Sequence, residues 1–498
     1  MKLGYGIGSK PPNAGLPARE RAAAIGVALL AALSVAGRLF FLLRRPVWHD
    51  EIYTVWVSRR SAASLVAALR ADSGPPLYYL LARPFVVIAE ALALPDSFAR
   101  LLCFAAIILT GLLGAWALGR GRGRLLFLAL AATSPLLFLY SVEARAYAVV
   151  ALLHFALFLL VRGESPRGGR LAAIVVLSAA ALYTHYLAAF FLAALAAGAL
   201  ATRRRAAAAA LAAGGILFIP WIPILLRQPT AATVWIHEGI PASLAGFLAA
   251  LGGGARIPAP FGPPAPAALS VLCTAAGVLL LGTLAIPAAR RDPDVVLGTA
   301  AVLGTLGLVL AVSFARPIAF AGRTEVAVLP VWLFVVARAA GSSRPVRILA
   351  RVSAALGAAV VAGVLSAPPG IPASATVVRT LERLSAPGDV IVAGSSLYLP
   401  VELALERGSI RGSAISYPRD IAGHPGWFVP RPAQEEDFRT VEEALSALPS
   451  SGRAWFALHP AWQTPRLRAI LEAHGSAREV LHGPGAALTR LETAPPGR

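Results

Sequence analysis

Long apolar runs, separated by short arginine-rich turns, occupy residues 21–366. A helix needs about 20 apolar residues to cross a bilayer. The pattern therefore indicates a mainly α, polytopic transmembrane protein of about 11 to 13 helices. The predicted crossing helices are residues 21–43, 98–118, 125–140, 146–161, 171–184, 187–200, 207–226, 267–288, 295–314, 325–340 and 349–366.

Two segments leave the number of crossings open. Residues 75–92 begin with two prolines and carry Arg83-Pro84 at their centre. We expect this run to lie beside the membrane or to enter it only in part, because proline interrupts helices. Residues 171–200 lie between two basic loops and would span about 45 Å as one helix. They form either a helical hairpin with Thr184-His185-Tyr186 at its apex or one long tilted helix.

Arginine clusters indicate which loops face the cytoplasm, since basic loops stay on that side. They lie in the amino-terminal tail and at residues 120–124, 162–170, 203–205 and 344–351. If 75–92 does not cross, the loops that contain Asp50, Glu143 and Arg323 all face outward, as does the carboxyl-terminal tail. The arginines between residues 44 and 60 then lie outside, against the charge rule.

The polarity of the chain changes near residue 370. Residues 371–498 hold 13 of the 25 acidic residues. Strand-like stretches (391–394 and 455–459) alternate there with helix-like stretches (near 373–385, 439–447 and 465–474), which predicts a small α/β domain. The predicted organisation is a cytoplasmic tail at 1–20, a transmembrane domain at 21–366 with outer loops 44–97 and 227–266, and an extracytoplasmic α/β domain at 367–498.

Composition excludes two classes of protein. Hydrophobic residues make up 57% of the chain and charged residues only 14%, which fits neither an ordinary soluble domain nor a disordered chain. The net charge of +20 lies in loops between apolar runs, so it indicates contact with membrane lipids and not with nucleic acid. The two cysteines imply no disulfide framework. Residues 21–43 are too long for a signal peptide, and the predicted location is the cytoplasmic membrane.

Acidic residues beside the outer helix ends are the first candidates for chemistry. Asp50 and Glu51 follow the first predicted helix, where charge is costly unless water or a partner is near. Glu143 lies two residues before Arg145 in a second outer loop. Each has a structural alternative, because the first pair can begin a helix and the second can be an ion pair that holds a helix end.

His185, Arg323 and Asp72 are expected at the same level as these acids. A structural histidine and an arginine that anchors the membrane interface are the alternatives. Two converging carboxylates could deprotonate an acceptor hydroxyl or hold a divalent metal against a phosphate. An arginine could bind that phosphate and stabilise the charge that develops as it leaves.

Several motifs occur in an order that resembles a known superfamily: HDEIYT, PPLYYLL, SPLLFLYSVEARAY, YTHY, FIPWIPILLRQ and RPIAFAGR. The chain is similar over residues 21–366 to bacterial membrane glycosyltransferases of the protein O-mannosyltransferase and lipid A aminoarabinose transferase superfamily, of the family-39 or family-83 type. This resemblance implies a GT-C fold. It also implies an inverting transfer of a sugar from a polyprenyl-phosphate donor, on the outer face of the membrane, to a lipid, glycan or protein acceptor.

The resemblance also implies roles for single residues. Asp50 would be the general base with Glu51 beside it, and Glu143 would assist the acceptor or a metal. Those expected to line the carrier-phosphate or sugar pocket are Arg145, Tyr147, Arg323, Tyr78 and His49. His185 and Asp72 are the candidates for a divalent metal, the one cofactor considered. Thr324 follows Arg323 where relatives often have tyrosine, which departs from the family pattern.

Two other functions stay open on the residues alone. A transporter or lipid flippase also carries charges at membrane depth, but such proteins often have two related halves, and none are visible in this sequence. A scaffold protein with an outer binding domain would tolerate replacement of Asp50 and Glu143.

Overall fold

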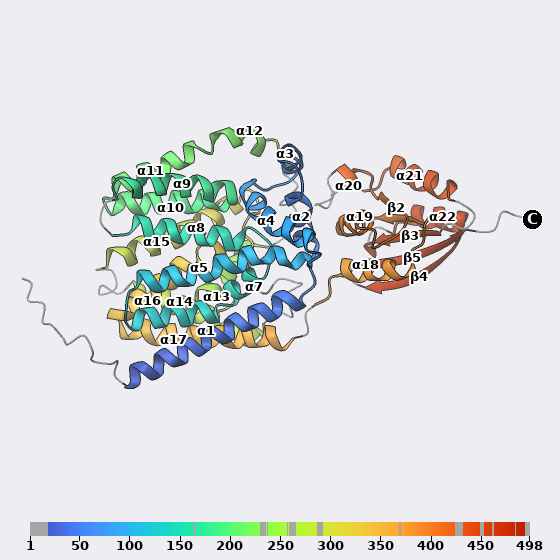
Figure 1. Cartoon of the computed structure of the whole chain (residues 1–498). Coiled ribbons are helices and arrows are strands. Elements are labelled where there is room, and N and C mark those ends of the chain that lie inside the picture. Colours follow the sequence, from blue (N-terminus) through green and yellow to red (C-terminus); the bar gives the residue numbers. More distant parts are fainter. Residues whose placement is uncertain are drawn as a thin grey trace, which may run out of the picture.

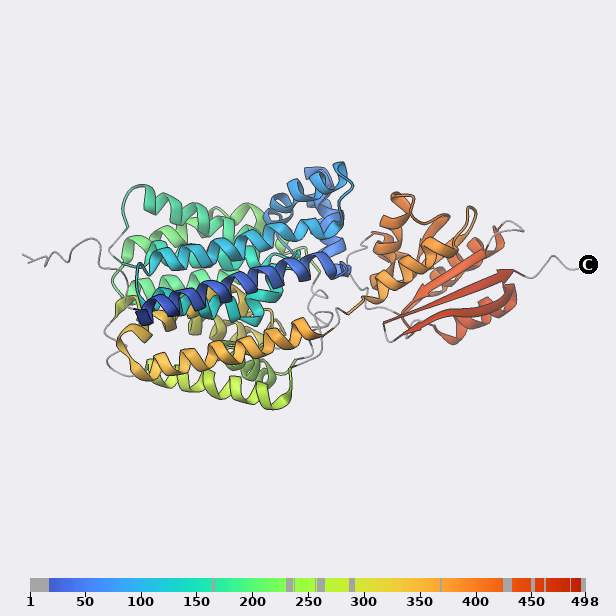
Figure 2. The same cartoon turned by 60° about the horizontal axis from the view of Figure 1, so that its bottom comes forward.

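The computed structural model describes residues 18–163, 166–229, 236, 238–255, 257, 265–285, 292–367, 370–423, 432–448, 453–460, 463–483 and 485–493. Nearly all of the predicted tail 1–20 and part of loop 227–266 lie outside these residues. Figures 1 and 2 show a bundle of long helices and, beyond one of its ends, an α/β unit formed by the carboxyl-terminal residues.

Each apolar run predicted to cross the membrane coincides with a helix or a pair of helices. Within the described residues, six helices are long and apolar enough to span a bilayer, and the bent pair α6–α7 would make a seventh span. The chain is thus a multi-pass membrane protein. The bundle helices are α1 (Ala18–Arg44), α5 (Leu101–Ala117), α6 (Arg122–Thr133), α7 (Pro135–Ser141), α8 (Tyr147–Val161), α9 (Gly169–Thr184), α10 (Leu187–Ala201), α11 (Arg205–Ile216), α12 (Ile222–Leu225), α13 (Ile240–Leu251), α14 (Ala267–Leu284), α15 (Pro293–Ser313), α16 (Leu329–Ser342) and α17 (Arg344–Ser366).

Residues 171–200 form two helices and not one long tilted helix. His185 interrupts them with an extended backbone, at φ −161° and ψ 137°. The helices on either side, α9 and α10, contact each other, as the hairpin alternative required.

The bend of 61° between α6 and α7 has a local cause. Pro135 begins α7 and cannot donate a backbone hydrogen bond, so carbonyls at the end of α6 lose their helical partners. Two side chains of α1 replace them: Ser34 Oγ donates to the Ala132 carbonyl at 2.6 Å, and Arg38 Nη2 donates to the Ala131 carbonyl at 3.4 Å. Buried backbone in a membrane protein requires such partners.

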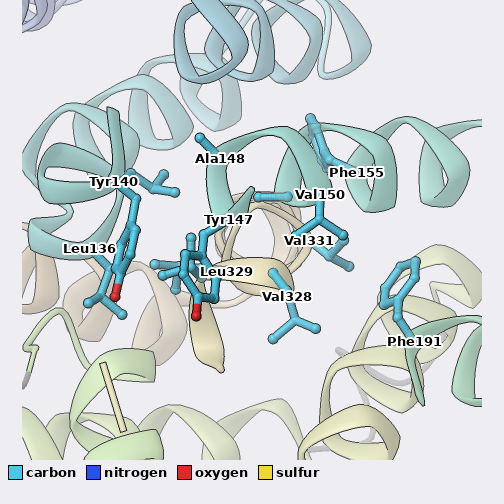
Figure 3. Close-up of a cluster of buried hydrophobic side chains, with 14 of the residues drawn as sticks. Leu136, Tyr140, Tyr147, Ala148, Val150, Phe155, Phe191, Val328, Leu329 and Val331 are labelled. Carbon is cyan, nitrogen blue, oxygen red and sulfur yellow. The ribbon is translucent and has the colours of Figure 1, made fainter. Parts of the chain in front are cut away.

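Tight contacts of small and aromatic residues fill the bundle. A side chain on Gly277 of α14 would meet the Leu248 carbonyl of α13 at 2.0 Å, so these helices pack backbone to backbone. Figure 3 shows the buried cluster between α8 and α16, in which Phe155 and Val331 take part.

The predicted outer loop 44–97 folds into helices that lie at the end of the bundle nearest the α/β unit (Figures 1 and 2). These are α2 (His49–Ser58), α3 (Ala62–Arg70), α4 (Leu77–Ala91) and the 3-10 helix η1 (Asp96–Arg100). The run 75–92 corresponds to α4, which is only 15 residues long and contains Pro84. It is not one of the candidate membrane spans.

The carboxyl-terminal unit is a five-stranded mixed sheet in the order β2-β1-β3-β5-β4. Strand β1 pairs in parallel with β2 and β3, whereas β5 pairs antiparallel with β3 and β4. Its elements are α18 (Ala373–Leu384), β1 (Val390–Ala393), η6 (Ser395–Leu397), α19 (Tyr398–Glu406), β2 (Ser413–Ser416), α20 (Asp420–Gly423), α21 (Glu435–Ser446), β3 (Arg453–Leu458), α22 (Pro465–His474), β4 (Gly475–Gly483) and β5 (Ala486–Thr493). The predicted fold class, helical membrane protein with a small α/β unit, is confirmed.

Candidate active site

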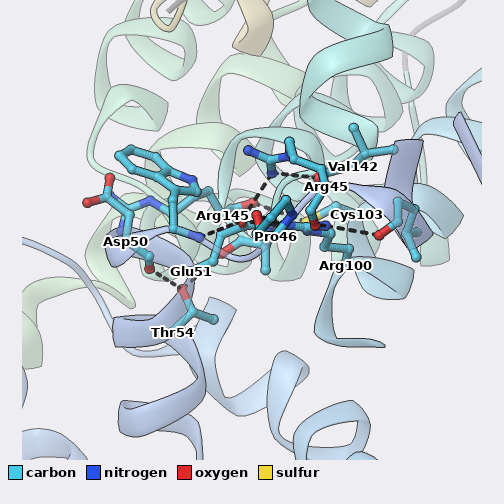
Figure 4. A network of polar contacts seen from close by, with 12 residues as sticks. Arg45, Pro46, Asp50, Glu51, Thr54, Arg100, Cys103, Val142 and Arg145 are labelled. Carbon is cyan, nitrogen blue, oxygen red and sulfur yellow. Dashed lines mark hydrogen bonds and ion pairs between the residues drawn. The ribbon is translucent and has the colours of Figure 1, made fainter. Parts of the chain in front are cut away.

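Two adjacent acids at the start of α2 have opposite environments. Trp48 is the residue before the helix, and its backbone N–H donates to Glu51 Oε2 at 3.3 Å, as expected for an acid in a first helical turn. The Asp50 side chain is 21% exposed, whereas the Glu51 side chain is completely buried. In Figure 4 Asp50 lies at the edge of the polar network and Glu51 at its centre.

Glu51 is held by two buried arginines that the sequence analysis did not assign to the site. Arg100 donates from Nε and Nη2, each at 2.6 Å, and Arg45 Nη2 lies 3.1 Å away. Burial alone would raise the pKa of Glu51, but these two cations lower it overall. Arg100 Nη1 also donates to the carbonyls of Leu42 and Arg45 at the end of α1, where helical carbonyls lack partners.

The same network fixes Glu143, the second acid predicted to face outward, through its backbone. Glu51 Oε1 accepts the Ala144 N–H at 2.9 Å, Arg45 donates to the Val142 carbonyl at 2.9 Å, and Thr54 donates to the Ala144 carbonyl at 2.9 Å. The peptide groups on both sides of Glu143 are therefore anchored to α2 and its flanks. Glu51 was expected to act beside Asp50, but its carboxylate faces the protein interior, which favours a positioning role.

Asp50 meets two arginines from distant segments. Its Oδ2 lies 3.6 Å from Arg145 Nη2 and 4.0 Å from Arg323 Nη1. Both distances exceed the usual length of a direct hydrogen bond, so these are loose ion pairs. The structure thus brings together three residues that the sequence analysis placed in one site, from α2, the loop before α8 and the loop before α16.

Glu143 is a buried carboxyl group close to this cluster. Its Oε2 has no hydrogen-bond partner among the described residues. Burial raises the pKa of Glu143 to about 7, even though Arg323 and Arg45 favour the charged form. A carboxyl group that titrates near neutral pH can exchange a proton during a reaction.

Arg323 projects from a loop stabilised by its neighbours. Both Glu325 carboxylate oxygens accept the Gly322 N–H, at 3.0 and 2.9 Å, and Gly322 has a φ of +88°, which favours glycine. The Arg323 guanidinium lies 5.8 Å from the Trp48 ring centre and 5.0 Å from that of Phe320. Thr324, the residue after Arg323, donates to the Phe320 carbonyl at 3.2 Å.

The remaining predicted pocket residues surround these charges at different depths. The ring of Tyr147 lies 5.1 Å from that of His185. Tyr78 is buried, and its hydroxyl lies 3.7 Å from Cys103 Sγ, which in turn donates to the Arg145 carbonyl. Tyr78 therefore supports Arg145 through Cys103. His49 is the first residue of α2, directly before Asp50.

The predicted metal ligands, His185 and Asp72, both lie among the residues that the structure describes. No three histidine, cysteine, aspartate or glutamate side chains there lie close enough together to hold one, and Ca²⁺ takes six or more oxygen ligands. His185 Nδ1 accepts the Leu187 N–H at 3.1 Å. Burial, with Arg145 and Arg323 nearby, lowers the pKa of His185 to about 4. Asp72 is buried and interacts with Tyr53. Burial and the nearby Asp72 both raise the pKa of Tyr53. A metal held by His185 and Asp72 stays a prediction.

Of the two missed arginines, Arg45 and Arg100, only Arg45 had a signal in the sequence. On the predicted topology Arg45 faces outward, against the positive-inside rule, and such an arginine needs an anionic partner. Here the partner is Glu51, inside the protein.

Comparisons with known proteins give the fold. No protein-family model and no curated protein matches the sequence. Among solved structures, ArnT from Cupriavidus metallidurans in the apo state is similar, with a TM-score of 0.58 and 14% identity over 94% of this chain and 98% of that one. The crystal structure of the same protein bound to undecaprenyl phosphate has a TM-score of 0.57 and 13% identity over 95% and 99% of the two chains. The chain therefore has the GT-C fold of the lipid A aminoarabinose transferase ArnT.

Proposed function

We propose that this protein is an inverting glycosyltransferase that moves a sugar from a polyprenyl-phosphate carrier to an acceptor hydroxyl at the outer face of the cytoplasmic membrane. The observation that carries the proposal is the contact of Asp50 with Arg145 and Arg323 at the end of the bundle nearest the α/β unit. The fold is shared with an ArnT structure bound to undecaprenyl phosphate, which supports the same class of lipid carrier.

The arrangement fits the charges of such a reaction. A lipid phosphate brings negative charge that must be matched as the sugar leaves, and two guanidinium groups supply that match. Their contacts to Asp50 are longer than hydrogen bonds, so phosphate oxygens can compete for the same N–H groups. The Asp50 carboxylate remains partly accessible, whereas Glu51 does not.

The proposed step is one displacement. The acceptor oxygen attacks the anomeric carbon of the donor, and the bond from that carbon to the phosphate oxygen breaks with its electron pair. The phosphate leaves on polyprenol, next to Arg145 and Arg323. The hydroxyl proton passes to a carboxylate, and Asp50 is the group we assign, with Glu143 orienting the acceptor. A single displacement inverts the anomeric centre.

The position of the charges favours a transferase over a transporter. The acidic and basic residues gather beside helix ends, in α2 and in the loops before α8 and α16. Transporter sites are typically near the bilayer midplane, between broken helices. A flippase would move the lipid without breaking the bond to the sugar.

A purified protein in lipid nanodiscs tests the proposal. Polyprenyl-phosphate sugars, pentoses and hexoses in turn, are supplied with membrane lipids, glycans or peptides as acceptors, and sugar release from the carrier is measured. Asp50→Asn should lower the rate by about 10² or more, the effect of losing a general base. The matched control is Asp294→Asn, which changes another acid paired with arginines, Arg204 at 3.2 Å and Arg162 at 3.8 Å. Equal rates for wild type and Asp50→Asn would remove Asp50 as the base.

A further inference from the structure

The helix that begins with His49, Asp50 and Glu51 is covered by the carboxyl-terminal unit. Eight consecutive residues of α2, Glu51 to Ser58, are buried. A helix of ten residues has so long a buried stretch only when neighbours surround it. Helix α4 contacts α2 within the bundle, and α19 contacts it from the carboxyl-terminal unit. Figure 1 shows α19 on the side of the α/β unit that faces α2.

The contact has an apolar centre. Leu399 and Leu403 of α19 are 0% and 3% exposed, and they belong to the same buried cluster as Ile52, Tyr53 and Trp56 of α2. The carboxyl-terminal unit has two further hydrophobic clusters of its own around its sheet. These two leucines therefore extend the core of the bundle and not that of the α/β unit.

Two adjacent charged residues at the end of α19 bind α2 and the short helix η1. Glu406 Oε2 lies 3.2 Å from Arg59 Nη1, at the carboxyl end of α2. Arg407 binds Asp96 with two nearly parallel hydrogen bonds, of 2.8 and 2.7 Å. Asp96 begins η1, and Arg100, which ends η1, binds Glu51. Arg407 is thus connected to the Glu51 cluster through one short helix.

We infer that the carboxyl-terminal unit is a positioning domain: through α19 it holds α2 and η1 so that Asp50 faces Arg145 and Arg323. Residues Leu403, Glu406 and Arg407 are positioning residues, because they touch α2 and η1 and not the candidate site. The effect on sugar transfer rests on the proposed function, but the effect on α2 does not. Bidentate arginine–carboxylate pairs give defined geometry, and small displacements of a reacting group can cost up to about 10² in rate.

The test combines hydrogen exchange of α2 with transfer kinetics, both on the full-length protein in nanodiscs. Leu403→Ala and Arg407→Asp should each raise amide exchange in residues 49–58 and lower kcat by about tenfold, with KM changed less than about twofold. The double variant Asp96→Arg/Arg407→Asp restores opposite charges. It should recover most of the protection of α2 from exchange and most of kcat. The control is Arg466→Ala, which removes an exposed ion pair with Glu435 within the α/β unit, 3.0 Å long. It should change neither the exchange of α2 nor kcat.

Unchanged exchange in α2 for Leu403→Ala and Arg407→Asp would overturn the inference. So would an Arg466→Ala variant with the same losses, since the effect would then be general destabilisation of the unit. If the wild type transfers no sugar from any carrier, the proposed function fails, and the exchange measurements still decide whether α19 holds α2.

Discussion

Replacing each of the two adjacent acids by its amide should give opposite phenotypes. Glu51→Gln removes the carboxylate charge that pairs with both buried arginines, Arg45 at 3.1 Å and Arg100 at 2.6 Å. Removal of one partner of a buried ion pair costs about 3–5 kcal/mol, because a buried charge is left without compensation. Asp50→Asn removes two loose, partly exposed ion pairs, which contribute about 0–1 kcal/mol in total.

These free energies translate into different melting temperatures. An unfolding entropy of about 2.1 cal/mol/K per residue gives roughly 0.7 kcal/mol/K for a bundle of about 350 residues. Glu51→Gln should therefore lower the midpoint by about 4–7 °C, and Asp50→Asn by about 1 °C or less. Intrinsic fluorescence of the tryptophans during heating in detergent measures both midpoints.

The transfer rate completes the comparison. Asp50→Asn should lose at least about 10² in rate while it melts like the wild type. Glu51→Gln should lose activity together with stability, because Glu51 anchors the Ala144 amide beside Glu143. A Glu51→Gln protein that melts and transfers like the wild type would refute the positioning role. An Asp50→Asn protein that melts many degrees lower would refute the distinction between the two acids.

Further predictions concern pH and packing. Burial raises the pKa of Glu143 to about 7, so its carboxyl group is protonated below that pH and charged above it. The transfer rate should therefore rise with pH through about 7, and Glu143→Gln should abolish this rise in a pH–rate profile. An unchanged profile would assign the titration to another group. Because the neutral form is favoured in the folded state, the contribution of Glu143 to stability is lost as pH rises through about 7, and Glu143→Gln should flatten that part of a melting-temperature profile. Gly277→Ala would place a methyl group 2.0 Å from the Leu248 carbonyl and should destabilise the bundle by about 1–3 kcal/mol, whereas Gly282→Ala in the same helix meets nothing within 4 Å and should leave the melting temperature unchanged.

The apolar pattern predicted the bundle helices except α13, which lies in the segment 227–266 that was expected to be an outer loop. The apolar runs were long, and proline or arginine stood at most of their ends. The other helices of the bundle therefore occur where they were expected. Arg145, Arg323 and Asp50 could also be placed together, because they follow or precede predicted spans at one end of the bundle. Their roles in transfer stay predictions.

Local pattern could not distinguish Asp50 from Glu51. Whether an acid is partly exposed or faces the interior depends on the turn of α2 and on Arg100, which lies 49 residues from Glu51 in sequence. Helix α19 was not predicted either, because its stretch YLPVELALE is only nine residues long. Its burial follows from two separate surfaces, the sheet and α2, and no short-range period reveals such a helix.

If Asp50, Arg145 and Arg323 serve sugar transfer from a lipid phosphate, carrier release and glycosylation of the acceptor must occur together. The most direct measurement is a single turnover in nanodiscs with a doubly labelled polyprenyl-phosphate sugar, in which freed polyprenyl phosphate and glycosylated acceptor are counted together. We predict one freed carrier for each sugar transferred, an inverted anomeric configuration in the product, and loss of both signals in Asp50→Asn. Transport of the intact labelled lipid between leaflets without cleavage, at equal rates in wild type and Asp50→Asn, would contradict the account.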